Sequence, residues 1–344
     1  MKMQKRAADY GIQVGKLKKG ARNKITDVAG VTVGHCTVDT ENHKTGVTMI
    51  MPCEENTLHH NLPAAAFVLN GFGKTAGLVQ IEELGTIESP IAMTNTLNVG
   101  KVHDAVVEYL CRKEESEGGK ATTLNPIVTE CNDSSLNDIR HRAVGEKEVF
   151  EAIEQASEDF LEGAVGAGTG MICHGLKGGI GSASRVMDVD GRDYTLGVLA
   201  LANYGAMSDL TIAGENIGKE LAKKLENTPV DKGSCIIVIA TDLPLDTRQL
   251  GRVAKRASVG LARLGSFIGH GSGEVFIAFS TANAIDPSDK AMIRETKSFR
   301  EGDMDLAFRA VAECAEEAIL NVLFTAKTVT GYKGKKVYGL TDVL

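Results

Sequence analysis

Short apolar runs recur along the chain, and their spacing predicts where the strands lie. The runs near the N-terminus are rich in β-branched residues and are separated by glycine and threonine, which is typical of strands joined by turns. The segment SCIIVIAT at 234–241 is almost unbroken in its apolar character, which indicates a strand covered on both faces. The pattern predicts strands over residues 31–38, 45–51, 64–70, 91–94, 194–202, 234–241 and 274–280.

Other segments repeat their apolar residues every three or four positions, as one face of a helix does. In 248–264, for example, Leu250, Val253 and Leu261 fall on one side. The charged stretch 112–119 ends in glycine and is expected to be a surface loop. The pattern predicts helices over residues 99–111, 147–160, 216–225, 248–264 and 306–326.

The order of these elements favours an α+β fold, because strands and helices are mixed without strict alternation. Covered strands combined with amphipathic helices indicate sheets enclosed between helix layers. At roughly 150 residues per domain, a chain of 344 residues would form about two domains. A large layered sandwich could equally use the whole length as one domain.

Composition and charge narrow the class of protein. Hydrophobic residues make up 43% and charged residues 24%, as in ordinary globular proteins, and the net charge is −7. The chain contains no basic tract that would attract nucleic acid and no apolar run long enough to span a membrane. The basic N-terminus is not followed by the apolar segment of a secretory signal, so we expect a cytoplasmic protein.

The seven cysteines are widely spaced, and no two form a C-x-x-C pair. This spacing indicates neither a disulfide framework nor a zinc site. We expect reduced, mostly buried thiols and no bound metal.

The junction between a polar linker (226–233) and the strand predicted at 234–241 offers a specific chemistry. A serine is a poor nucleophile until a base removes its hydroxyl proton. If the chain were cut before Ser234, the new α-amine, with a reference pKa of about 7.7–8.0, could serve as that base. Gly233 has no Cβ, so a tightly turned peptide is tolerated there. The alternative interpretation is a turn glycine followed by the first serine of a strand.

The segment His270-Gly271-Ser272-Gly273-Glu274 precedes another predicted strand. In an extended segment Ser272 and Glu274 point to the same side, where a carboxylate and a hydroxyl could orient a nucleophile. A glycine turn with a solvated glutamate is the alternative. His270 could be a general base, or a capping or core histidine.

Two glycine-rich segments, at 166–170 and 177–185, resemble a phosphate cradle. They match neither the G-x-G-x-x-G nor the G-x-x-x-x-G-K-[ST] pattern, and close contacts between backbones would also explain them. After them, Asn203 ends a predicted strand. Its amide could donate to an oxyanion, or it could simply belong to a turn.

An acidic segment runs from Thr129 to Asp138 and holds three carboxylates and two amides within nine residues. It could bind the ammonium group of a substrate or cap a helix. A metal site is conceivable, but no histidine pair lies near it.

Taken in order, these segments resemble the family of L-aminopeptidase D-amidase/D-esterase (DmpA) and the β-peptidyl aminopeptidases. The resemblance covers nearly the whole chain. It is carried by VTVGHCTV (31–38), TGVTMIMP (45–52), NGFGKTAGL (70–78), SPIAMTNTLNVG (89–100), LNDI (136–139), GAVGAGTGM (163–171), KGGIGSASR (177–185), LANYG (201–205), KGSCIIVIATDLPL (232–245) and GLARLGSFIGHGSGEVFIAFSTAN (260–283).

The resemblance implies a four-layer αββα sandwich, similar to that of N-terminal nucleophile hydrolases but with different connectivity. It implies a single domain over 1–344 that cuts itself between Gly233 and Ser234, giving an α chain (1–233) and a β chain (234–344). It also implies a homo-oligomer, a tetramer or larger.

The same resemblance assigns roles to individual residues. It makes Ser234 the nucleophile, Ser272 and Glu274 its partners, and Asn203 an oxyanion donor. Some members carry a tyrosine as a second donor in a Glu-Thr-Tyr-Asp context. Here Glu130-Cys131-Asn132-Asp133 occupies that place, so the hydroxyl is missing, and Asn132 or a backbone N–H would have to donate instead. Glu130 is the candidate for holding the substrate ammonium.

The expected activity is hydrolysis of short peptides, amino-acid amides or esters through an acyl-Ser234 intermediate, without metal or cofactor. Three alternatives remain open. One is acyl transfer, because ornithine acetyltransferases are similar in architecture but use threonine. Another is nucleotide or phosphate binding through the 166–185 glycines. The third is a scaffold without activity.

Overall fold

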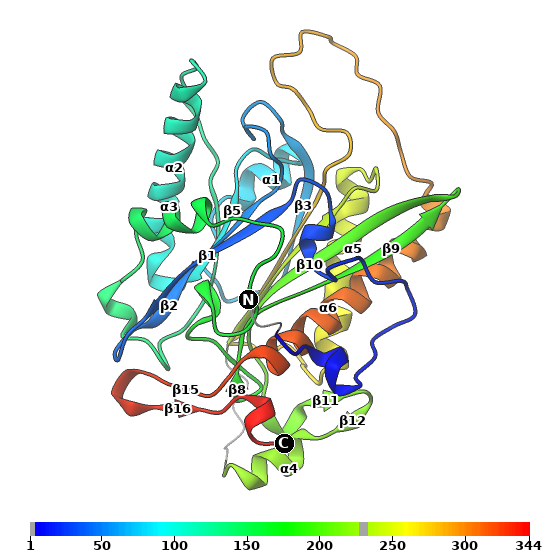
Figure 1. Cartoon of the computed structure of the whole chain (residues 1–344). Coiled ribbons are helices and arrows are strands. Elements are labelled where there is room, and N and C mark those ends of the chain that lie inside the picture. Colours follow the sequence, from blue (N-terminus) through cyan, green and yellow to red (C-terminus); the bar gives the residue numbers. More distant parts are fainter. Residues whose placement is uncertain (1–3, 227–232) are drawn as a thin grey trace.

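The computed structural model describes residues 4–226 and 233–344, and its main strands form two sheets (Figure 1). Six strands run in the order β4-β3-β14-β13-β10-β9, and four run in the order β1-β2-β5-β6. Their bounds are β1 Thr32–Asp39, β2 Lys44–Met51, β3 Leu62–Gly71, β4 Thr86–Ile87, β5 Ile91–Asn95, β6 Ile127–Cys131, β9 Gly179–Val189, β10 Arg192–Asn203, β13 Ser234–Thr241 and β14 Gly273–Ser280. Three short hairpins add β7 Ile172–Cys173 with β8 Leu176–Lys177, β11 Thr211–Ile212 with β12 Glu215–Asn216, and β15 Val329–Thr330 with β16 Lys336–Val337.

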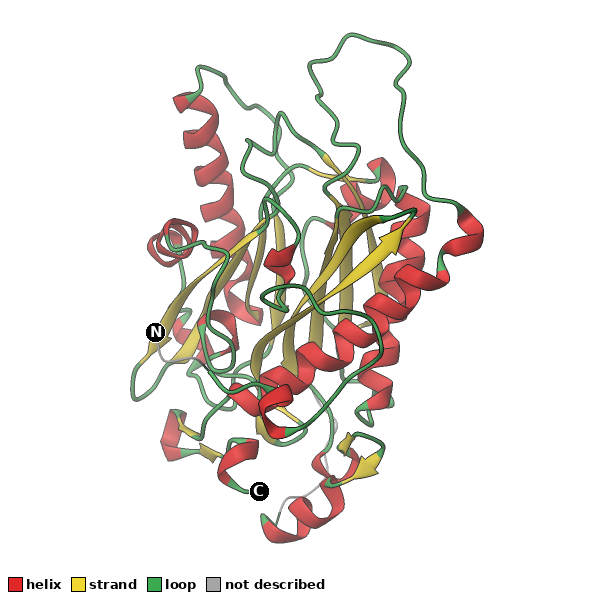
Figure 2. Cartoon of the chain, turned by 45° about the vertical axis from the view of Figure 1, so that its right-hand side comes forward, coloured by secondary structure: helices red, strands yellow, loops and turns green. Residues whose placement is uncertain are grey.

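Helices cover the outer face of each sheet, as Figure 2 shows. Helices α2 (Val99–Ser116) and α3 (Glu146–Glu154) contact the four-stranded sheet, and α5 (Thr247–Arg263) and α6 (Asp305–Thr325) contact the six-stranded sheet. The shorter α1 (Leu78–Leu84) and α4 (Gly218–Lys224) lie at the periphery. The predicted four-layer αββα arrangement is confirmed.

Three apolar cores fill the spaces between the four layers, and strand β13 contributes side chains to two of them. Its residues Cys235, Ile237 and Ile239 belong to the core beneath α5 and α6. The alternate residues, among them Ile236 and Val238, belong to the core between the two sheets. Because successive side chains of a strand point to opposite faces, a strand covered on both faces must be apolar throughout. This is the reason for the unbroken run at 234–241.

Two helices differ in length from their predictions. Helix α2 continues through the stretch expected to be a loop, as far as Ser116, because no residue before Gly118 interrupts it and Glu114 is buried by contacts with Asn56 and His59. Helix α3 ends at Glu154 rather than at residue 160. Beyond it Ser157 leaves the helix and exchanges two backbone hydrogen bonds with Val33, at 3.0 and 3.1 Å.

The glycine run at 177–185 is largely a strand, β9, rather than a phosphate cradle. It pairs antiparallel with β10 along its whole length, which occupies backbone N–H groups in the sheet. A Cβ at Gly181 would lie 2.1 Å from the Ala318 carbonyl oxygen of α6, so glycine lets the helix approach the sheet closely. The interpretation as close backbone contacts therefore holds for this run.

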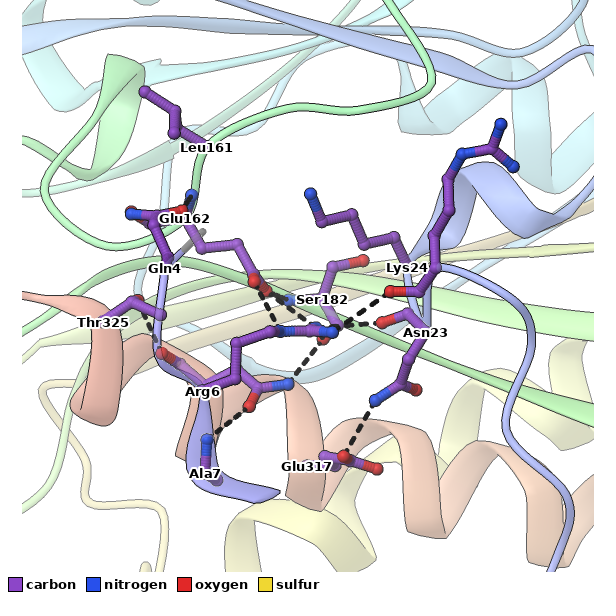
Figure 3. Close-up of polar contacts among 12 residues, drawn as sticks. Gln4, Arg6, Ala7, Asn23, Lys24, Leu161, Glu162, Ser182, Glu317 and Thr325 are labelled. Carbon is purple, nitrogen blue, oxygen red and sulfur yellow. Dashed lines mark hydrogen bonds and ion pairs between the residues drawn. The ribbon is translucent and has the colours of Figure 1, made fainter. Parts of the chain in front are cut away.

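The N-terminal segment is held by a buried polar cluster, shown in Figure 3. The Arg6 guanidinium pairs with Glu162 at 2.7 Å and also donates to the Asn23 carbonyl at 2.9 Å. Asn321 of α6 accepts from the Ala7 N–H at 3.1 Å and donates to the Ser182 carbonyl at 2.9 Å. The segment is thereby fixed to both β9 and α6.

The seven cysteines all lie within the described residues and form no disulfide there, and five of them are buried. Residues 227–232, which form most of the predicted polar linker, lie outside the described residues. In the part of the chain that the structure describes, no helix is both long enough and apolar enough to cross a membrane.

Candidate active site

Strand pairing brings distant segments together at one edge of the six-stranded sheet. Ser234, the first residue of β13, pairs with Asn203, the last residue of the antiparallel strand β10. On its other side Ser234 pairs with Gly273, the first residue of the parallel strand β14. A cleft of about 630 Å³ opens here, and its lining includes Ser234, Gly233, Asn203, Glu130 and Asn132. This volume is within the range of sites for small molecules.

Glycines make the room that Ser234 needs. A Cβ at Gly273 would lie 3.1 Å from the Ser234 hydroxyl and 2.6 Å from the Phe72 carbonyl oxygen. A Cβ at Gly233 would lie 1.7 Å from the Asn203 carbonyl oxygen, a distance that no side chain could tolerate. The Gly233 carbonyl, which belongs to the peptide bond before Ser234, accepts a hydrogen bond from the Gly273 N–H at 3.0 Å.

Ser272 and Glu274 flank Gly273, the strand partner of Ser234, and both are buried. The Ser272 hydroxyl donates to the Glu274 carboxylate, as their spacing of two residues predicted. The Asn70 amide donates to the Ser272 carbonyl and to that of Gly269, which fixes this turn. His270 is exposed and packs edge-on against Phe72, so it is neither a core histidine nor a buried base.

The side-chain amide of Asn203 is held at both ends. Its Oδ1 accepts from the Ile172 N–H at 2.8 Å, and its Nδ2 donates to the Asn132 carbonyl at 3.1 Å. An asparagine amide carries two N–H donors, so the second remains available toward the cleft.

Glu130 is almost fully buried, yet it lines the cleft. It accepts hydrogen bonds from the Lys74 backbone N–H at 2.9 Å and from the Thr96 hydroxyl. A carboxylate has about four acceptor positions, so these two donors orient Glu130 and leave capacity for a third.

Of the two residues that follow Glu130, Cys131 points into the core, whereas Asn132 lines the cleft. Cys131 donates to the Leu201 carbonyl and belongs to the core between the sheets, and burial raises the pKa of its thiol well above the usual value. The Asn132 side-chain oxygen accepts from the Ser134 N–H at 3.0 Å. Asn132 contributes its backbone carbonyl, which orients Asn203.

Several residues of the site lie in segments quoted for the family resemblance but received no role from the sequence. Phe72, Lys74 and Thr96 line the cleft. The Lys74 ammonium lies 4.6 Å from the centre of the Phe72 ring, which makes a cation–π contact at the cleft wall. These segments enter the site only through the packing of the two sheets.

One group of metal-ligand side chains lies elsewhere. Among residues 4–226 and 233–344, the ligand atoms of His59, Glu114 and Glu117 lie within 4.8 Å of one another, close enough to hold a metal ion. Asn56 Nδ2 donates to both carboxylates, at 3.2 and 2.8 Å, and His59 Nε2 lies 2.9 Å from Glu114. These contacts give both carboxylates hydrogen-bond partners within the protein.

Comparison with known proteins gives a consistent result. Peptidase family S58 matches residues 23–337. The β-peptidyl aminopeptidase BapA of Sphingosinicella xenopeptidilytica is 40% identical over 97% of this chain and 88% of its own length.

Solved structures agree over almost the whole chain. The PH0078 protein of Pyrococcus horikoshii OT3 is 48% identical, with a TM-score of 0.91 over 98% of this chain and 96% of its own. The L-aminopeptidase D-Ala-esterase/amidase of Ochrobactrum anthropi, described as a new variant of the Ntn hydrolase fold, is 34% identical, with a TM-score of 0.90 over 97% and 95%. Fold, sequence and coverage together show that this chain is a hydrolase that belongs to peptidase family S58.

Proposed function

We propose that the protein is an aminopeptidase and amidase that activates itself by cutting the bond between Gly233 and Ser234. The observation that carries this proposal is the position of Ser234. It is the first residue of β13, it opens into the cleft, and Asn203 and Gly273 flank it in the sheet. An amine freed at Ser234 would lie beside its own hydroxyl, in the arrangement that an N-terminal nucleophile requires.

Self-cleavage begins when the Ser234 hydroxyl oxygen attacks the carbonyl carbon of Gly233. The peptide C–N bond breaks, the acyl group moves to the hydroxyl oxygen, and the proton moves to the nitrogen. Water then hydrolyses the ester, which leaves a carboxylate on Gly233 and an amine on Ser234. The hydrogen bond from the Gly273 N–H to the Gly233 carbonyl supports this step, since negative charge develops on that oxygen.

In the mature enzyme the Ser234 α-amine takes the hydroxyl proton as Oγ attacks the substrate carbonyl, and returns it to the leaving amine. The remaining N–H of Asn203 donates to the oxyanion. The hydrogen-bonded pair Ser272 and Glu274 orients the nucleophile and its ammonium. Water then releases the acyl group from Ser234.

Glu130 favours a substrate with a free ammonium group. Glu130 is the acidic side chain of the lining and, with its two donors in place, is oriented to accept a third from a substrate ammonium. We therefore propose short peptides, amino-acid amides and esters with an unblocked N-terminus as substrates.

The direct test combines intact mass spectrometry with an activity panel. Purified protein is expected to yield two fragments, 1–233 and 234–344, and to hydrolyse aminoacyl p-nitroanilides. The same substrates with an acetylated amine should not be hydrolysed, because Glu130 then has no ammonium to bind. Protein that stays uncut and is nevertheless active would contradict the mechanism.

Lys335 is expected to bind the C-terminal carboxylate of a dipeptide substrate. It is exposed, it lines the cleft, and its hairpin is tied to the segment after Asn132 by a hydrogen bond from the Tyr332 N–H to the Leu136 carbonyl. If Glu130 binds the ammonium group of a dipeptide, Lys335 would attract its carboxylate. We expect Lys335→Met to lower kcat/KM for a dipeptide by about 2- to 5-fold, the range of an exposed charge pair, and to leave the dipeptide amide unaffected.

The matched control for Lys335 is on the same hairpin. The Lys336 ammonium lies 4.7 Å from the centre of the Tyr338 ring, and Lys336 is not among the residues that line the cleft. Lys336→Met removes the same charge and should change neither substrate. Equal losses for dipeptide and amide would argue against carboxylate binding.

The single domain over 1–344 and the homo-oligomer expected from the sequence remain predictions. Light scattering on the purified protein would measure the oligomeric state directly.

A further inference from the structure

Lys177 is a fully buried cation that the mechanism above does not use. Its ammonium donates to the carbonyls of Gly168, Met171 and Gly178, at 3.0, 2.8 and 2.8 Å. These three acceptors match the three donors of an ammonium group. Within the described residues Lys177 forms no ion pair, so its polar contacts are to the backbone of residues 168–178.

One of these carbonyls connects Lys177 with the proposed oxyanion donor. The Met171 carbonyl belongs to the same peptide group as the Ile172 N–H, and this N–H donates to Asn203 Oδ1 at 2.8 Å. Three groups are thus joined in series: the ammonium, the peptide between residues 171 and 172, and the Asn203 amide. The last two members of the series, Ile172 and Asn203, line the cleft.

Such a series strengthens its last donor. A peptide group whose oxygen binds a cation becomes a stronger donor at its N–H, because hydrogen bonds in a chain polarise one another. The same argument applies to the Asn203 amide, which accepts at Oδ1 and donates at Nδ2. The low dielectric around a buried site increases the effect.

The backbone around Lys177 is fixed, so the series has a defined geometry. The Gly178 N–H donates to the Met171 carbonyl at 2.9 Å, and the Lys177 N–H donates to the Tyr338 carbonyl at 2.7 Å. A Cβ at Gly178 would lie 2.4 Å from the Ala202 carbonyl oxygen, so this loop lies directly against the end of β10. Burial lowers the pKa of Lys177 to about 7, whereas hydrogen bonds from the ammonium to three carbonyls favour the protonated form.

We propose that Lys177 is a positioning residue that orients and polarises Asn203 through the Met171–Ile172 peptide and so promotes formation of the oxyanion. This inference rests on the proposed function, in which Asn203 donates to that oxyanion. It predicts an effect on the chemical step and little effect on substrate binding.

The test compares Lys177→Met with Lys24→Met, measured on chains shown by intact mass to be cleaved. Lys24 is a second buried lysine, and it donates to the Phe160 carbonyl at 2.6 Å, in a segment that does not line the cleft. We expect Lys177→Met to lower kcat by about tenfold with KM changed less than about twofold, since loss of an oxyanion donor itself costs roughly 10²–10³. Lys24→Met should reduce thermal stability while keeping kcat near the wild-type value.

A double-mutant cycle with Asn203→Ala distinguishes action through Asn203 from general loosening. If Lys177 acts through Asn203, adding Lys177→Met to Asn203→Ala lowers kcat no further. Multiplicative losses, or an equal loss of kcat in Lys24→Met, would overturn the inference. Lys177→Gln, which removes the charge but keeps two donors, serves if the methionine variant does not fold. Wild-type protein without activity would instead refute the proposed function.

Discussion

Ser234→Ala is expected to remain one uncut chain of 344 residues and to lose its peptidase activity. Alanine has no hydroxyl to attack the Gly233 carbonyl, so neither the cut nor the acyl-enzyme can form. Removal of a catalytic serine in a comparable hydrolase lowers kcat by about 10⁶-fold, so activity should fall to background. Intact mass spectrometry and p-nitroanilide hydrolysis measure both consequences.

The control for Ser234→Ala is Ser258→Ala, on α5. The Ser258 hydroxyl donates to the Lys255 carbonyl within the same helix, away from the cleft. This variant should be cut and active like the wild type. Ser234→Cys adds a positive test, since a thiol can attack the same carbonyl and should restore cleavage. Cutting of Ser234→Ala at the same bond would show that Ser234 is not the nucleophile of self-cleavage.

Arg185→Met is expected to produce the largest loss of stability. Arg185 is fully buried and pairs with Glu313 at 2.9 Å and with Glu317 at 2.7 Å, both on α6. Removing one partner of a buried ion pair typically costs about 3–5 kcal/mol, because the remaining charges stay buried. Here Glu317 would keep its pair with Lys19, and Glu313 would keep two backbone donors, but both would lose the arginine between them. For a chain of this size that loss corresponds to a decrease in Tm of roughly 4–7 °C.

The matched control is Arg263→Met, which removes an arginine that also pairs with α6. Arg263 lies 2.8 Å from Glu316, but its side chain is 47% exposed. An exposed pair contributes only about 0–1 kcal/mol, so Tm should hardly change. Thermal unfolding followed by circular dichroism compares the two variants. Equal shifts would contradict the expected importance of the buried pair.

The Arg185 pairs also bear on self-cleavage. Arg185 lies before the proposed cleavage site, whereas Glu313 and Glu317 lie after it. After cleavage these ion pairs would connect two separate chains. The N-terminal segment adds to the connection, since the Lys16 and Leu17 N–H groups donate to Glu313 at 2.9 and 3.1 Å.

Sequence alone determined most of the main elements, although not β6 or β9, because local periodicity encodes which faces are buried. The apolar run at 234–241 specified β13 with its bounds, since both faces of that strand meet a core. The spacing of Ser272 and Glu274 placed two side chains on one side of an extended segment, where they form a hydrogen bond. The quoted motifs gave the family, and the family gave the αββα arrangement.

Tertiary structure determined the contacts between distant segments, which no local sequence pattern encodes. The glycines of β9 allow the backbone of α6 to pack closely against the strand. The two segments are more than 130 residues apart in the sequence. Helix α3 ends early because Ser157 pairs with Val33. The neighbours of Ser234 are set by register between strands far apart in the chain, and Lys177 reaches Asn203 only through a loop folded onto β10. Periodicity records which side of an element is buried, whereas the packing of whole layers determines which distant residues meet there.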